Sequence, residues 1–257
     1  PCVEAILAHT DYPNFEVLIL DNQSQCPETL AFMQAVAERD ARVRVLEWDR
    51  PFNYSAINNF GAQQARGEIL GLVNNDIEPI NREWLDEMAR QVVRPEIGCV
   101  GAKLYYPNDT IQHAGVILGI GGVAGHSHKY FHRNAPGYFT RLHLAHNLSA
   151  VTGACLLVRK AVFEEVGGLD AENLAVAFND VDFCLRVREA GYRNLWTPYA
   201  ELYHHESVSR GADDTSAKRA RAQAEAEYMQ RTWGEALYSD PAYNPNLTLA
   251  HEDFSLR

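Results

Sequence analysis

The chain has 257 residues, of which 46% are hydrophobic and 22% are charged, and its formal net charge is −11. This length and composition are typical of a globular protein that buries one large core. An acidic domain is a poor candidate for general nucleic-acid binding, because the phosphate backbone repels it. The five cysteines are widely spaced and form no C-x-x-C pair, which argues for a reducing compartment and against a disulfide framework or structural zinc.

Strand-like and helix-like segments alternate through the first third of the chain. Ser55 is the predicted N-cap of the third helix. Strands separated by helices predict an α/β fold, with a mostly parallel sheet and helices on both faces. The elements expected from hydrophobic spacing are, in chain order, a helix at 3–8, a strand at 15–20, a helix at 29–39, a strand at 43–46, a helix at 55–66 and a strand at 68–73.

The most informative stretch follows the strand at 68–73. Its apolar run stops at Asn74, Asn75 and Asp76, three short polar side chains that end in a carboxylate. In open α/β sheets ligands bind beyond the carboxyl ends of strands, and a hard divalent cation prefers oxygen ligands. The alternative is a plain turn, because Asn and Asp favour turns. Asp21 ends an earlier strand in the same way, so both carboxylates are predicted at one edge of the sheet.

The middle of the chain changes character. Residues 115–137 are rich in glycine, histidine and aromatic side chains, which predicts a loop-like segment. His126 and His128 are zinc ligands in one interpretation and solvated polar residues in the other, which is the commoner case on a loop. Gly153, inside a predicted strand, indicates close approach of the backbone to another group. The expected elements are a helix at 84–93, strands at 99–104 and 151–158, helices at 161–166 and 184–190, a strand at 193–197 and an extended segment at 200–205.

A second acidic cluster contains Asp180 and Asp182, which fall in the first turn of a predicted helix. Two interpretations stay open: acidic residues that complement the helix dipole, and a general base at the rim of a pocket. The two are compatible, since one carboxylate can cap the helix while the other faces a substrate. Farther on, His204 and His205 point to opposite faces of an extended segment, so at most one is expected to bind a given ion.

Taken in order, these motifs resemble the family 2 glycosyltransferases of the GT-A fold, a Rossmann-like α/β fold. The resemblance spans about residues 1–210, and within the family it is most similar to enzymes of bacterial O-antigen and rhamnan-type polysaccharide assembly. The segments that carry the family resemblance are 21–24, 74–76, 153–158, 167–170, 179–182 and 203–205. The narrower match rests on 51–59, 112–115 and 240–246.

The resemblance implies how the donor is bound. Asp21 matches the acidic residue that holds the nucleotide base or ribose. Asn74, Asn75 and Asp76 match the DxD motif, in which the last Asp binds a Mg²⁺ or Mn²⁺ ion that bridges the donor diphosphate. His204 matches the histidine that completes the metal site. Asn74 replaces the first Asp of the motif and removes a charge, so low ion affinity is expected without bound donor.

The resemblance also implies the general base. Asp180 matches the Asp of the family's acidic "ED" motif, which deprotonates the acceptor hydroxyl. Asn179 replaces the Glu of that motif, so the base stays open between Asp180 and Asp182. A metal that neutralises the diphosphate improves the leaving group, and one direct displacement inverts the anomeric centre. This reaction requires no covalent nucleophile, and the sequence presents no Ser/Cys–His arrangement.

The two ends of the chain carry further expectations. Family members begin with a central strand that precedes the first helix, and this chain starts inside that helix, so a longer protein is expected. We predict a GT-A domain at 1–210 and a C-terminal helix and tail at 211–257 packed on it. The helix at 215–237 closes the back of the sheet in the favoured interpretation. In the other it is a lid or docking element, and Arg210 reaches the donor diphosphate.

The expected function is inverting, metal-dependent transfer of a sugar from a nucleotide-diphosphate sugar to a hydroxyl of a growing bacterial surface glycan. The expected partners are this donor, a glycan or lipid-linked glycan acceptor, and other glycosyltransferase domains of a longer chain, with no nucleic acid. A cytoplasmic location with peripheral association at the inner face of the membrane is expected. The alternatives are a sugar nucleotidyltransferase, whose Gly-rich phosphate loop is not visible, and a non-catalytic glycan-binding domain.

Overall fold

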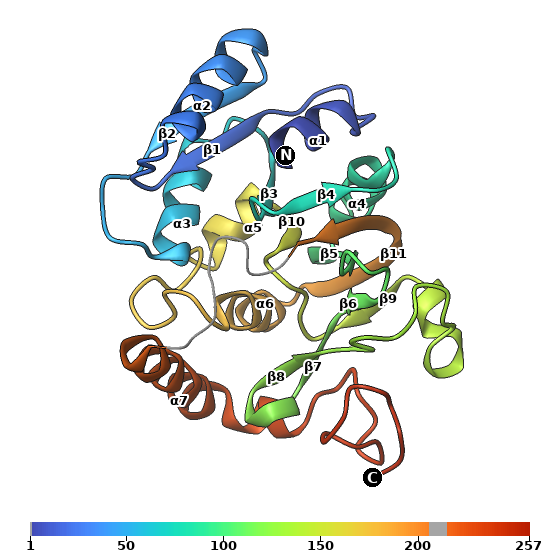
Figure 1. The fold of residues 1–257 in the computed structure, drawn as a ribbon. Helices are drawn as coiled ribbons and strands as arrows, with labels where there is room; N and C mark the ends of the chain where they lie inside the picture. Colours follow the sequence, from blue (N-terminus) through green and yellow to red (C-terminus); the bar gives the residue numbers. More distant parts are fainter. Residues whose placement is uncertain (1, 206–214) are drawn as a thin grey trace.

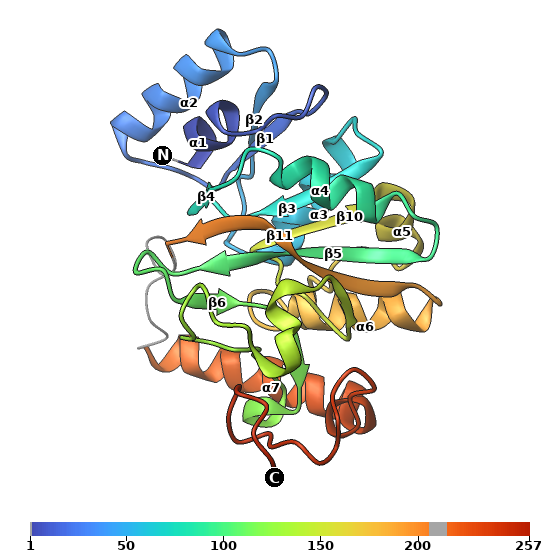
Figure 2. The same cartoon turned by 90° about the vertical axis from the view of Figure 1, so that its right-hand side faces the viewer.

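The computed structural model describes residues 2–205 and 215–257, which build a central sheet covered by helices on both sides (Figure 1). In Figure 2, α4 lies above the sheet, α6 lies below it, and α7 lies beyond α6. The helices are α1 (Cys2–Ala8), α2 (Pro27–Arg39), α3 (Tyr54–Gln64), α4 (Trp84–Val92), α5 (Lys160–Glu165), α6 (Asn179–Glu189) and α7 (Ser216–Tyr238). The strands are β1 (Val17–Asp21), β2 (Val43–Glu47), β3 (Ile69–Val73), β4 (Ile77–Pro79), β5 (Ile97–Tyr105), β6 (Ile111–His113), β7 (Val116–Leu118), β8 (Ala124–His126), β9 (His146–Leu148), β10 (Cys155–Arg159) and β11 (Arg193–His204).

The central sheet has the strand order β3-β10-β5-β11-β4, with β6 beside β5 and β9 beside β11. Every residue of β5 is buried, as expected for a strand with apolar layers on both faces. β5 and β11 run parallel, so their carboxyl ends meet at one edge, and the arrowheads in Figure 2 point to the same side. β11 ends there at His204, beside β4.

The α/β class is as predicted, but the sheet is mixed rather than mostly parallel. β1 pairs with β2 in parallel and β5 with β11, whereas β10 is antiparallel to both β3 and β5, and β4 is antiparallel to β11. Parallel neighbours need a crossover connection, but β10 enters the sheet after the long stretch 106–154, which holds only short strands and turns, and it can run in either direction. Local hydrophobic spacing carries no information about that direction.

β1 and β2 form a small sheet of their own. A Cβ atom on Gly61 of α3 would lie 2.7 Å from the side chain of Leu20, so glycine lets α3 approach β1 closely. In the described chain β1 pairs only with β2, β3 pairs only with β10, and no strand lies between β1 and β3. The prediction that Asp21 and Asp76 end strands of one sheet is therefore wrong, because they belong to two separate sheets.

The start of α3 differs from the prediction by two residues. Asn53, rather than Ser55, caps the helix by accepting a hydrogen bond of 2.9 Å from the backbone of Ala56. The Ser55 hydroxyl instead donates to the carbonyl of Leu174 and is fully buried. A serine that finds a partner 119 residues away cannot be distinguished from a cap by local sequence.

The irregular middle holds more order than its composition predicts. The segment 115–137, expected to be loop-like, contains the antiparallel hairpin β7–β8. The strand expected at 151–158 begins only at Cys155, so Gly153 precedes it rather than interrupting it. The close approach predicted at Gly153 is confirmed, since a Cβ there would lie 3.3 Å from both Asp180 and the hydroxyl of Tyr54.

The C-terminal helix α7 packs on α6 and β7 rather than directly on the sheet. Its buried residues Met229, Trp233 and Leu237 belong to the same core as α6 (Figures 1 and 2). Thr215 caps the helix by accepting from the backbone of Lys218. The lid predicted around 206–214 lies outside the described residues. No described helix is long and apolar enough to cross a membrane.

Candidate active site

His204 and Asp76 meet at the carboxyl edge of the sheet. His204 ends β11, and Asp76 lies between β3 and β4, where the backbone of His205 donates to its carbonyl at 3.0 Å. The Nε2 atom of His204 is 3.1 Å from Oδ1 of Asp76, and both side chains are about nine-tenths buried, at 11% exposure each. His205 points elsewhere and pairs with Glu78, which confirms that neighbouring histidines on this strand face different partners.

A glutamine fixes the orientation of the His204 ring. The Nδ1 atom of His204 lies 2.8 Å from Oε1 of the buried Gln112 on β6, so Nδ1 carries the proton and donates it. Nε2 then presents a lone pair, with the amide of Asn74 3.4 Å away. Oδ1 of Asp76 is buried and has no hydrogen-bond partner. Two acceptors therefore lie 3.1 Å apart, a separation that suits neighbouring ligands of one cation.

The electrostatics of Asp76 agree with a cation-binding role. Burial opposes ionisation, but a proton on Nε2 of His204 would pair with the carboxylate, outweigh burial and hold the pKa of Asp76 below its usual range, and a metal ion at the same place would supply the positive charge instead of that proton. The carboxylate is thus ionised at neutral pH. A buried anion with one unsatisfied oxygen is costly unless a positive charge joins it.

These residues fit a divalent cation that shares its coordination with a ligand. One carboxylate oxygen and one imidazole nitrogen are suitable donors for Mn²⁺ or Mg²⁺, which bind further oxygens from phosphate or water. Within residues 2–205 and 215–257 no group of three or more His, Cys, Asp or Glu side chains is placed to hold a metal. Among the described residues, Asp76 and His204 are therefore the pair that would suit an open, shared site rather than a closed structural cage.

Asp180 is held beside this site by backbone groups. Its Oδ2 accepts from the N–H of Gly153 at 2.8 Å, and its Oδ1 accepts from the N–H of Val181 at 2.9 Å. Ala154, the residue after Gly153, connects the segment that holds Asp180 to the turn that carries Asp76. Its carbonyl accepts from the N–H of Asn74 at 3.0 Å. Asp180 is half-buried, and each of its oxygens retains a lone pair for a further hydrogen bond.

Tyr54 lies between the two carboxylates. Its hydroxyl donates to the carbonyl of Gly153 at 3.0 Å. Burial, and then the charges of Asp180 and Asp76, raise the pKa of Tyr54, so the phenol remains protonated. Tyr54 of α3 therefore stabilises the Gly153 peptide, whose N–H holds Asp180. The pKa of Tyr54 also depends on both acidic residues.

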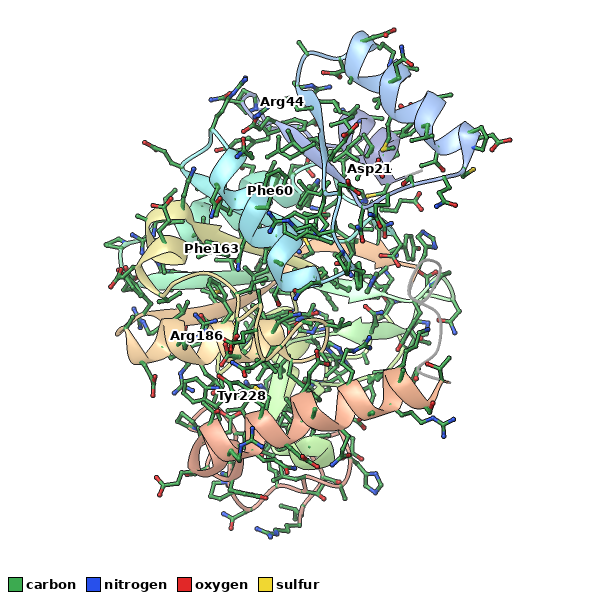
Figure 3. All side chains as sticks on the ribbon, turned by 90° about the vertical axis from the view of Figure 1, so that its left-hand side faces the viewer. Asp21, Arg44, Phe60, Phe163, Arg186 and Tyr228 are labelled. Carbon is green, nitrogen blue, oxygen red and sulfur yellow. The ribbon has the colours of Figure 1, made fainter. Side chains whose placement is uncertain are left out.

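Asp182, the other candidate base, occupies a different environment. Its side chain is 2% exposed; Oδ2 accepts from Arg186 at 2.8 Å, and Oδ1 accepts from the indole of Trp233 at 2.8 Å. Figure 3 shows Arg186 on α6 and Tyr228 on the facing helix α7, which mark this layer of the molecule. Both oxygens of Asp182 are thus occupied, one by Arg186 of the same helix and the other by Trp233 of α7. This arrangement favours Asp180 over Asp182 as the base.

The remaining donor candidates are only partly placed with this cluster. Asn74 touches His204, and Asn75 lies in the same short turn between β3 and β4. Asp21 belongs to the small sheet, where its Oδ1 accepts from the backbone of Ser24 at 3.1 Å; Figure 3 shows it in the N-terminal part of the molecule, far from Tyr228. Arg210 lies outside the described residues.

The histidines of the irregular segment do not form a zinc site. His126 lies against His113, with their Nδ1 atoms 2.8 Å apart, whereas Nε2 of His128 accepts from the backbone of Tyr138. The alternative expectation of solvated side chains is also wrong for His128, which is 1% exposed and stacks on Phe254 of the C-terminal tail. Composition could not reveal this, because the tail that buries His128 is distant in sequence.

Sequence reasoning assigned no role to Gln112 or Tyr54. Both lie in segments that carry the narrower resemblance, 112–115 and 51–59, but neither residue type by itself indicates a site. Their partners are 92 and 99 residues away, so only the fold brings them to His204 and Gly153.

Solved structures share this fold. A mannosyltransferase from Pyrobaculum calidifontis, in complex with GDP-Man and Mn²⁺, matches 95% of this chain with a TM-score of 0.62 and 18% identity, and the match covers 63% of that protein. GalNAc-T7 with UDP, GalNAc and Mn²⁺ matches 95% of this chain, and 55% of its own, with a TM-score of 0.63 and 12% identity. At these identities the likeness shows the fold alone, and it confirms the GT-A class.

Sequence comparisons extend to the family. The O-antigen biosynthesis protein RfbC of Myxococcus xanthus is 44% identical over 99% of this chain, and an uncharacterized protein of Sinorhizobium fredii, y4gI, is 55% identical over the same share. This chain spans only 20% and 28% of the lengths of those two relatives. The family model described as glycosyl transferase family 2 matches residues 1–167, which is more than half of the sequence. The chain therefore belongs to glycosyltransferase family 2.

Proposed function

We propose that this chain is an inverting, metal-dependent glycosyltransferase domain that moves a sugar from a nucleotide-diphosphate donor to a hydroxyl of a bacterial surface glycan. The observation that carries the proposal is the pair formed by Asp76 and His204. Two acceptor atoms 3.1 Å apart, one of them a buried oxygen without a hydrogen-bond partner, match the needs of a shared divalent cation. Their place beyond the carboxyl end of β11 is where α/β sheets bind ligands.

The roles of the protein groups follow from their positions. When bound by Asp76 and His204, Mn²⁺ or Mg²⁺ would offset the charge of the donor diphosphate and so improve it as a leaving group. Asp180 accepts the proton of the acceptor hydroxyl, a weak nucleophile until it is deprotonated. The N–H groups of Gly153 and Val181 fix the carboxylate so that its free lone pairs keep a constant direction.

A single displacement is the reaction that this arrangement favours. Asp180 is a base rather than a covalent nucleophile in this proposal, because its oxygens are already oriented by backbone donors beside the donor site. Attack by the acceptor from the side opposite the leaving diphosphate inverts the anomeric carbon. Asp21, Asn74 and Asn75, together with Arg210, are proposed to contact the nucleotide part of the donor.

The relatives suggest the acceptor. RfbC of Myxococcus xanthus is named for O-antigen biosynthesis, and a 66-residue segment is 41% identical to a rhamnosyltransferase of Mycobacterium tuberculosis that is named for a diphospho-decaprenol acceptor. We therefore propose a glycan or lipid-linked glycan acceptor and a cytoplasmic location, with peripheral association at the inner face of the membrane. The longer relatives support a place among further domains, in which glycosyltransferase units act on one glycan.

A panel of sugar nucleotides tests this function. We expect release of nucleoside diphosphate with one donor, dependent on Mn²⁺ or Mg²⁺ and lost in EDTA. Asp76→Ala is expected to abolish both turnover and metal-dependent donor binding, measured by titration calorimetry, while thermal unfolding stays close to that of the wild type. The matched control is Glu78→Ala, which removes an exposed carboxylate two residues away that pairs with His205.

Three results would contradict the proposal. Full transfer by Asp76→Ala, or activity unchanged in EDTA, would remove the metal from the mechanism. Donor binding without transfer to any acceptor would favour the non-catalytic glycan-binding alternative instead.

A further inference from the structure

A buried carboxylate of α7 holds the loop that leads to the proposed base. Glu225 is 2% exposed, and its two oxygens accept from two successive backbone N–H groups, Val176 at 2.8 Å and Ala177 at 3.1 Å. Hydrogen bonds to a charged acceptor are stronger than neutral ones, and a bidentate pair also fixes orientation. The side chain of Arg221, one turn earlier on α7, lies 3.6 Å from Glu225 and balances part of its charge.

The held loop turns sharply into α6. Phe178 has φ of 58°, the left-handed conformation that costs energy for a residue with a side chain, and it comes immediately before the helix. The amide of the buried Asn179 donates back to the carbonyl of Val176 at 2.9 Å. Val176 is thus hydrogen-bonded through its N–H to Glu225 and through its carbonyl to Asn179.

The two hydrogen bonds on Val176 help to determine the position of Asp180. Asp180 follows the strained turn by two residues, and its own bond to the N–H of Gly153 comes from the segment just before β10. The carboxylate is therefore located by two independent holds, one from this segment and one from α7. Releasing the α7 hold would let the turn at Phe178 relax and move Asp180 relative to the donor.

We infer that Glu225 is a positioning residue for catalysis, which acts by fixing the turn that carries Asp180. The inference rests on the proposed function, in which Asp180 is the base. It gives α7 a catalytic purpose beyond packing, although Glu225 touches neither substrate nor metal. The sequence pattern of the helix predicted a packed face or a lid, and neither interpretation distinguished Glu225, because a Glu among other charged residues of an Ala-rich helix resembles a solvated residue.

The test is a double-mutant cycle between Glu225 and Asp180. Glu225→Gln keeps the size of the side chain but leaves one acceptor oxygen for two N–H donors. We expect about a tenfold or greater fall in kcat, with the donor dissociation constant in the presence of Mn²⁺ unchanged. In the Asp180→Asn background the same substitution is expected to cost nothing further, because the base through which it acts is already absent.

The matched control is Gln230→Ala, which removes another α7 hydrogen bond, from the Gln230 amide to the carbonyl of Gly122 at 3.3 Å, between β7 and β8 and away from the loop that carries the base. Its kcat is expected to stay within twofold of the wild type. A parallel variant, Asn179→Ala, removes the opposite hold on Val176 and is expected to show the same loss of kcat with intact donor binding. Asn179→Ala takes the place of Glu225→Gln in the test if Glu225→Gln yields no folded protein.

The outcomes separate the inference from the function. Wild-type kcat in folded Glu225→Gln, or an equal loss in the Asp180→Asn background, would overturn the positioning role while leaving the glycosyltransferase proposal standing. Full transfer by Asp180→Asn would instead remove the base from the proposed function. A kcat loss in Glu225→Gln that disappears in that background supports both.

Discussion

At the scale of single residues, the site depends on how acceptor atoms are turned toward one another. Gln112 accepts a hydrogen bond from Nδ1 of His204, which leaves Nε2 to face Asp76. Second partners of this kind orient metal-binding histidines throughout proteins, and their loss weakens the site without removing a ligand. Cation binding is therefore expected to need Gln112 as well as the two candidate metal ligands, Asp76 and His204.

Gln112→Leu tests this orientation. Without the acceptor the ring of His204 can rotate or change tautomer, so we expect Mn²⁺ affinity in the presence of donor to fall by roughly 10–100-fold. Titration of Mn²⁺ followed by electron paramagnetic resonance measures it. Gln112→Glu keeps an acceptor oxygen at the same distance and is expected to retain most of the affinity. Equal affinities for Gln112→Leu and the wild type would show that the ring needs no partner.

The two acidic residues of α6 make opposite predictions. Asp180→Asn keeps size and removes basicity, so we expect transfer to fall by roughly 10²–10⁴-fold while donor binding persists. Asp182→Asn weakens contacts with Arg186 and Trp233, so we expect lower stability with a smaller change in kcat. Steady-state kinetics and urea unfolding of both variants decide between them. A large kcat loss confined to Asp182→Asn would place the base two residues farther along α6.

At the scale of elements, local patterns were reliable and pairings were not. The apolar run of β3 and the amphipathic spacing of α4 were predicted within a residue or two, because both signals are contained in the segment itself. The antiparallel direction of β10 and the hydrogen bond from Ser55 to Leu174 depend on partners far along the chain. Asp76 was found by its place at a strand end, whereas the roles of Gln112 and Tyr54 needed the fold.

The contact between α6 and α7 is an element-scale prediction. The indole N–H of Trp233 donates to the buried Asp182 carboxylate, which also pairs with Arg186, so Trp233→Phe leaves one of its oxygens without a donor. We expect a loss of about 1–3 kcal/mol in the free energy of unfolding, measured with urea. Trp84→Phe is the control, because the indole of Trp84 donates to the neutral hydroxyl of Thr10 and its loss should cost less. Equal costs would mean that the charge of Asp182 adds nothing.

At the scale of the whole molecule, two apolar cores lie on either side of the sheet, and a third small cluster joins the tail to the middle of the chain. The tail cluster contains Tyr243, Leu247 and Phe254, packed against Ile117 and Ile120. Several histidines lie close to this junction. Burial lowers the pKa of both His128 and His146 to about 4, from an ordinary value near 6.5.

These histidines predict acid sensitivity with a definite sign. Between about pH 6.5 and pH 4, His128 and His146 are protonated in the unfolded chain but stay neutral in the folded protein. Their contribution to the free energy of unfolding is therefore fully present above about pH 6.5 and is lost as the pH falls toward 4. For the buried His128 the loss approaches roughly 3 kcal/mol, as an upper figure. We expect the urea midpoint to fall from pH 7.5 to pH 5, and less steeply in His128→Phe, which can still stack on Phe254. His143→Ala, at an exposed position, should leave the slope unchanged; identical slopes for His128→Phe and the wild type would show that acid acts elsewhere.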